Sequence, residues 1–92
     1  MYRDMLNVRK RKRNESLSEL AQDIATLVAR AFPGPKTHHL DLIAVDAFLR
    51  ALDDADLVEK ARGRDPDNLD MAFKIALRYE SYRTVGNSFL WK

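Results

Sequence analysis

The chain of 92 residues has no cysteine and only three glycines, Gly34, Gly63 and Gly86. Without cysteine there is no disulfide framework, no thiolate nucleophile and no cysteine-bearing zinc site. The glycines stand too far apart to form a glycine-rich phosphate-binding loop. No apolar run approaches the roughly 18 residues needed to span a bilayer, and the first residues lack the apolar core of a signal peptide. We therefore expect an intracellular, cytoplasmic protein with no membrane contact.

The size and charge of the chain indicate one small domain with a charged N-terminal segment. A chain of this length builds only a modest core, which favours oligomerisation. Residues 1–13 carry six Lys or Arg against one Asp, whereas residues 14–92 carry ten against thirteen Asp or Glu. A polyanionic partner would therefore meet the first segment and not the remainder.

No constellation of side chains predicts catalysis. The adjacent His38 and His39 lack a third ligand at a metal-like spacing, so we assign them a structural role at the start of a helix. The carboxylates of Asp53, Asp54 and Asp56 lack the alternating pattern of a calcium loop, and helix capping is their expected role. The sequence thus predicts a protein that is not an enzyme, without metal, cofactor or small-molecule substrate.

A helix is predicted to begin at Ser16 and to end before Pro33. Ser16 and Glu19 have the spacing of a capping box, in which each side chain bonds the other's backbone amide. Two prolines around Gly34 end the helix, since proline cannot continue it. The helix carries one apolar stripe, formed by Leu17, Leu20, Ala21, Ile24, Leu27, Val28 and Ala31.

A second helix is predicted from His38 or His39 to Leu52, and it is apolar on two sides. One stripe contains Leu40, Ile43, Ala44, Ala47, Phe48 and Ala51, and the other contains Leu42, Val45, Leu49 and Leu52. Such a helix is buried on more than one side. Either it is central to the domain, or its Leu42–Leu49 face meets another molecule, and we take this face as the main candidate for homotypic contact.

Two more helices follow, over about 54–62 and 69–83, with Gly86 and Asn87 ending the last one. The expected organisation is a basic arm or short helix over 1–15, a helical domain over 16–85 and an apolar tail over 86–92. The fold class is all-α, a small bundle of four to five helices.

The role of the basic run is left open by its composition. A solvated linker and nonspecific contact with RNA or a small polyanion are weighed equally, because a charge run alone does not decide between them. Glu80 falls on or beside the buried stripe of the last helix, and we take it as a buried polar residue. Its carboxylate is either paired with Arg11, Arg13 or Arg50, or lies at the edge of the stripe in water. The candidate polyanion-binding residues are Arg9, Lys10, Arg11, Lys12 and Arg13.

Taken in order, these features resemble the C-terminal capsid domain of Gag from gypsy-type LTR retrotransposons and their domesticated, Arc-like relatives. The retroviral capsid and SCAN domains are related to that family. Positions of the retroviral major homology region are matched by Glu15 and by the apolar anchors Leu17, Leu20 and Ile24. Arg11 and Lys12 depart from the Gln and Gly of that region, and Asp23 stands where retroviruses carry Arg. The similarity extends from about Arg11 to Arg83.

The resemblance implies a capsid C-terminal-like fold and a structural protein that associates with itself. Dimers would form through the second helix and lead to capsid assembly. The homology-region-like residues Arg11, Glu15, Leu17, Leu20 and Ile24 would hold the fold together, and the interface residues would be Leu42, Val45, Asp46 and Leu49. The alternatives are a SCAN-like dimerisation module of a regulatory protein, or a nonspecific nucleic-acid-binding module that uses the basic arm.

Overall fold

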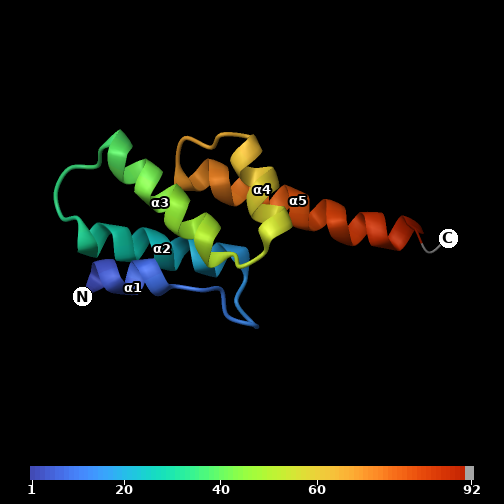
Figure 1. Ribbon diagram of the computed structural model, residues 1–92, viewed down its shortest axis with the longest axis horizontal. Coiled ribbons are helices and arrows are strands. Elements are labelled where there is room, and N and C mark those ends of the chain that lie inside the picture. The colour runs from blue at the N-terminus through green and yellow to red at the C-terminus, as the bar shows by residue number, and fades with distance from the viewer. Residues whose placement is uncertain (91–92) are drawn as a thin grey trace.

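The computed structural model describes the backbone of residues 1–90 and the side chains of residues 1–82. This part of the chain forms five helices and contains no strand (Figure 1). The predicted all-α class is therefore confirmed. The helices are α1 (Tyr2–Val8), α2 (Leu17–Ala31), α3 (His38–Ala51), α4 (Ala55–Gly63) and α5 (Leu69–Leu90).

The ends of α2 form as the sequence predicts. The Ser16 hydroxyl accepts the Glu19 amide at 3.1 Å, and the Glu19 carboxylate accepts the Ser16 amide at 3.3 Å. This capping box satisfies two of the amides that a helix start leaves unpaired. At the other end, Phe32 caps the helix, and Gly34 takes a φ of +124°, a conformation that favours glycine.

Polar side chains cap the remaining long helices. Thr37 accepts the Leu40 amide at the start of α3, a cap that the sequence analysis did not assign. Asp54 caps α4 and Asn68 caps α5, both as expected for acidic and amide side chains. The two helices are joined through Asp65, which adopts a left-handed φ of 51°.

The N-terminal residues, which were expected to form either an arm or a short helix, include the helix α1, which packs along α2. Leu6 is its only buried residue. Two aromatic contacts fix its position: the Arg3 guanidinium lies 4.6 Å from the Phe32 ring centre, and that of Arg30 lies 5.7 Å from the Tyr2 ring centre. Such contacts are worth about 0.5–1 kcal/mol each at exposed sites. Both contacts lie at the C-terminal end of α2, so α1 is held against that end of the helix.

The core is centred on α3, which contacts all four other helices. Phe48 is fully buried, and alanines at the contacts of α4 and α5 let these helices approach closely. The homology-region-like anchors of α2 lie in the same core. Its most buried members are Leu17, Leu20, Ile24, Ala47, Phe48, Leu49, Ala51, Leu57, Ala61, Ala72 and Ala76.

Helix α5 is longer than predicted and projects from the other four helices. Gly86 was expected to end it, but the helical backbone continues to Leu90. A glycine inside a helix costs only about 1 kcal/mol relative to alanine, so it need not end one. The second half of α5 extends to one side in Figure 1, and the molecule measures 52 × 25 × 18 Å. The side chains of the predicted tail over 86–92 lie outside the described residues.

Candidate functional site

The basic segment between α1 and α2 lies against the end of α3. The Arg11 amide donates to the Ala51 carbonyl at 2.8 Å, and the Lys10 ammonium donates to the Arg50 carbonyl at 3.2 Å. These carbonyls belong to the last turn of α3, whose carbonyl groups lack partners within the helix. The segment therefore satisfies backbone groups of the central helix, and the interpretation as a solvated linker is wrong for this part of it.

Arg9 is held between two carboxylates of the α2 region. Its guanidinium forms an ion pair with Glu15 and a second one with Asp23, the latter with an Nε to Oδ2 distance of 2.6 Å. Only 12% of the Arg9 side chain and 10% of the Glu15 side chain are exposed. A charge this far removed from water must be paired, so each of these two residues depends on the other.

Arg11 extends the same arrangement to the last helix. Its Nε donates to the Glu15 carbonyl at 2.9 Å, and one of its terminal nitrogens lies 2.8 Å from a carboxylate oxygen of Glu80 on α5. Of the two alternatives for Glu80, pairing is the one observed, and Arg11 is one of the three predicted partners. The Glu80 side chain is 39% exposed, so it lies at the edge of the core, and its expected burial was wrong.

These five residues form one polar cluster that connects α2 with α5 and, through the backbone amide of Arg11, also with α3. We call it the polar clamp; its members are Arg9, Arg11, Glu15, Asp23 and Glu80. Asp23, which stands where retroviral capsids carry Arg, is here the carboxylate partner of Arg9. The predicted structural role of Arg11 and Glu15 is consistent with these contacts.

The polar clamp shifts the pKa values of Glu15 and Arg9. Burial by itself would raise the pKa of Glu15, but the Arg9 hydrogen bond, the Lys12 amide and the Arg9 charge together lower it below its ordinary value of 4.5. Burial would likewise lower the pKa of Arg9, and its bonds to Glu15 and Asp23 raise it instead. Both shifts favour the charged forms, so the pair is ionised at neutral pH.

We expect Glu15→Gln to destabilise the fold by about 2 kcal/mol at neutral pH, the size of a hydrogen bond to a charged group. Since the folded-state pKa of Glu15 lies below its ordinary value, the stability it contributes is present above pH 4.5 and is lost as pH falls through the folded-state pKa. The difference between wild type and variant should therefore shrink in acid. Urea denaturation of both proteins across this range measures it. Glu59→Gln, at an exposed position on α4, is the control. If the stability difference between wild type and Glu15→Gln does not change with pH, the assignment of Glu15 to the ion pair is contradicted.

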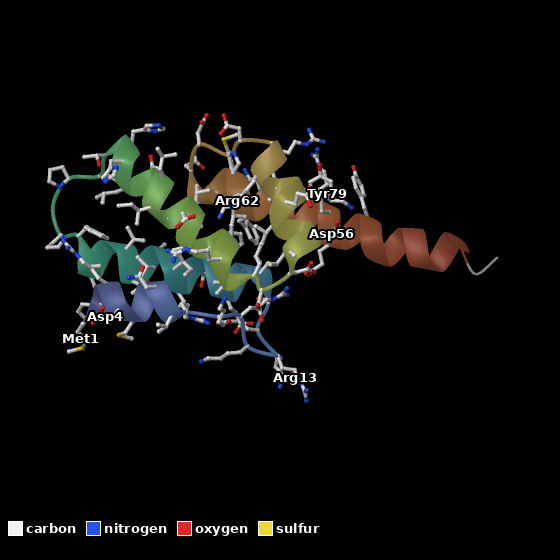
Figure 2. All side chains as sticks on the ribbon, viewed as in Figure 1. Met1, Asp4, Arg13, Asp56, Arg62 and Tyr79 are labelled. Atoms are coloured by element: carbon white, nitrogen blue, oxygen red, sulfur yellow. The ribbon has the colours of Figure 1, made fainter. Side chains whose placement is uncertain are left out.

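The other cations of the basic segment face solvent. The Lys10 side chain is 58% exposed and lies 3.9 Å from Asp53, and Lys12 and Arg13 are exposed. Arg13 lies at the tip of the loop, pointing away from the helices (Figure 2). The predicted five-residue polyanion surface is therefore reduced to Lys10, Lys12 and Arg13, because Arg9 and Arg11 are occupied by the polar clamp.

The predicted apolar face of α3 is exposed at one residue only. Leu42 is 44% exposed, but Val45 and Leu49 are 7% and 1% exposed and belong to the core of the single chain. The assignment of Val45 and Leu49 to an exposed interface was wrong; α3 is a central helix, the other alternative that its two stripes allowed. Asp46 is half-buried and pairs with Arg50 at 2.8 Å and with Arg62 at 3.1 Å.

A groove that the sequence analysis missed lies among the end of α2 and the starts of α3 and α5. It has a volume of about 580 Å³, within the size range of small-molecule pockets. No sequence motif could have revealed it, because three separate elements contribute its walls. The lining residues are Ala25, Val28, Ala29, Phe32, Gly34, Lys36, Leu40, Asp41, Ala44, Asn68, Leu69 and Asp70.

The described residues contain no cluster of metal-binding groups. His38 and His39 are exposed at the start of α3. Within residues 1–82, no three His, Asp or Glu side chains come close enough together to hold a metal ion.

None of the described helices combines the length and the apolar character that crossing a membrane requires.

Comparisons with known proteins identify no relative. No protein-family model, no curated protein sequence and no solved structure matches this chain.

Proposed function

We propose that this chain is a structural self-association domain of the kind found in the Gag capsid proteins of gypsy-type LTR retrotransposons, in which it forms dimers and contributes to capsid assembly. The proposal rests on the ordered similarity between Arg11 and Arg83 and on what those residues do in the fold. Five helices around a central α3 are compatible with a capsid C-terminal-like domain. A partner of this domain is then a second copy of itself.

The polar clamp is the observation that carries the proposal. The positions that match the homology region are the apolar anchors of α2, which are buried, and Glu15, which is paired. These residues join three helices into one unit. Structural residues of this kind hold a domain rigid without forming a catalytic pocket. A rigid domain suits a protein whose function is to present the same surface repeatedly to copies of itself.

The surface that we assign to the dimer is the exposed side of α3. Leu42 provides an apolar centre, with Arg50 and the half-buried Asp46 along the same side of the helix. In a two-fold dimer the same patch meets itself, and a patch that contains both charge signs is self-complementary. One exposed leucine makes a small interface, so we expect weak association that a high local concentration in an assembly would favour.

Leu42→Glu is expected to weaken dimerisation at least tenfold, because it places two like charges at the apolar centre of the contact. Sedimentation equilibrium across protein concentration measures the change. The control is Leu77→Glu on α5, since Leu77 and Leu42 are both 44% exposed. Far-UV circular dichroism should show both variants folded.

Two results would count against the proposed contact. If wild type remains monomeric up to about 1 mM, the range of the weakest specific complexes, the domain has no intrinsic dimer. If Leu77→Glu weakens association as much as Leu42→Glu, then general loss of exposed apolar surface explains the effect, and α3 is not the interface.

A further inference from the structure

The groove beside α2, α3 and α5 offers an apolar site that the proposed α3 contact does not use. Its apolar lining includes Val28, Phe32 and Leu69, together with the small side chains of Ala25 and Ala29. Ala25 and Ala29 are themselves exposed, so the groove can be entered from solvent. Its volume of about 580 Å³ accommodates several large apolar side chains.

Helix α5 carries an apolar segment far from this groove. Leu69, the first residue of α5, lines the groove, whereas Leu90 ends the helix. At 1.5 Å per residue, the two ends of this helix lie about 32 Å apart. Figure 1 shows the C-terminal half of α5 leading away from α2 and α3. The backbone of α5 at Leu90 therefore lies far from the groove of its own chain, and the sequence Phe89-Leu90-Trp91 spans this end of the helix.

We propose that the groove binds the Phe89–Trp91 segment of a second copy of this chain. The segment supplies three consecutive large apolar residues, which gain by leaving water, and the groove supplies an apolar lining. The charged residues that line the groove are Asp41 and Asp70 against one cation, Lys36, and Lys92 directly follows Trp91. The occupant is thus a segment of this chain itself.

This contact differs in symmetry from the one proposed for α3. There, one patch meets its own copy and the contact closes at a dimer. Here a tail meets a groove, so a complex of two copies leaves one tail and one groove free, and the contact extends from copy to copy unless it closes into a ring. The inference rests on the proposed function in that both contacts join copies of this chain, but the two surfaces share no residue. Together they would build an extended assembly from a single domain.

The experiment uses Trp91, which is the chain's single tryptophan. A groove-blocked variant, Ala29→Arg, places a long charged side chain at an exposed groove position. A tail-defective variant combines Phe89→Glu with Trp91→Ser and has no tryptophan. Ala55→Arg makes the same change at an exposed alanine on α4, outside the groove, and is the matched control. Circular dichroism establishes that each variant is folded.

We expect wild-type tryptophan emission to shift to shorter wavelength as the concentration rises from about 1 µM to about 1 mM, the range of weak complexes. The mass should rise over the same range. Ala55→Arg should behave like wild type, and Ala29→Arg should show no shift. Mixing Ala29→Arg with the tail-defective variant should restore the shift in a one-to-one complex, because one chain supplies the tail and the other the groove.

Absence of the concentration-dependent shift in wild type would overturn the inference, and so would a mixture that fails to restore it.

Measuring the same shift in the Leu42→Glu variant distinguishes the groove contact from the proposed α3 contact. If the shift persists in Leu42→Glu, the groove contact is independent of α3. If Leu42→Glu is as associated as wild type while the groove variants are not, the α3 contact fails and the groove contact stands.

Discussion

Leu49→Asp is expected to unfold this chain, whereas Leu42→Asp should leave it folded. Leu49 is 1% exposed and lies in the core around α3, beside the fully buried Phe48. An isolated carboxylate there has no partner, and the cost of burying it exceeds about 4–5 kcal/mol, the upper range for single substitutions. That is comparable with the entire stability of a small domain, about 5–15 kcal/mol.

Far-UV circular dichroism and thermal unfolding measure this difference directly. Leu49→Asp should show loss of helical signal near room temperature, and Leu42→Asp should stay within about 1 kcal/mol of wild type, since its side chain is 44% exposed. The opposite result, a folded Leu49→Asp protein that no longer associates, would return Leu49 to an interface between copies and contradict its place in the core.

Arg9→Gln is expected to cost about 3 kcal/mol, the upper end of the range for a hydrogen bond to a charged group, because it removes the ion-pair partner of the part-buried Glu15. The Glu15 side chain is 10% exposed and cannot recover its hydration in place. Asp23 also loses a partner, but its side chain is 46% exposed, and water replaces the lost bond. At about 4–8 °C per kcal/mol for a domain of this size, the melting temperature should fall by about 15 °C.

Arg13→Gln is the matched control, since it makes the same change four residues later at the exposed tip of the loop. We expect it to alter stability by less than about 0.5 kcal/mol, as for most surface substitutions. Both proteins are compared by thermal unfolding at neutral pH. Equal melting temperatures for the two variants would show that Arg9 is not part of a stabilising cluster.

The local features of the sequence predicted most of the helices. The Ser16–Glu19 capping box and the prolines around Gly34 fix the ends of α2 through contacts within a few residues. Such signals can be read along the chain because they involve neighbouring positions. The end of α5 was missed at Gly86, where a weak penalty for glycine was taken as a stop.

Features formed by distant residues could not be read in the same way. Two apolar stripes predict that α3 is covered on both sides, but not whether its own chain covers them, so Val45 and Leu49 were assigned to the wrong surface. The basic run has the composition of a solvated segment, and only the fold brings Glu80 to Arg11. The groove, whose walls come from three helices, has no sequence signature.

The ion pair between Arg11 and Glu80 joins residues 69 positions apart, and this has a consequence for the order of folding. Contacts within the α2–α3 hairpin close short loops and form early, whereas a contact between the two ends of the domain closes nearly the whole chain and forms late. During synthesis, Arg11 therefore lacks its Glu80 partner until α5 has been made, although its bonds to the Glu15 and Ala51 carbonyls can form earlier. Helix α5 thus completes the polar clamp that the segment before α2 begins.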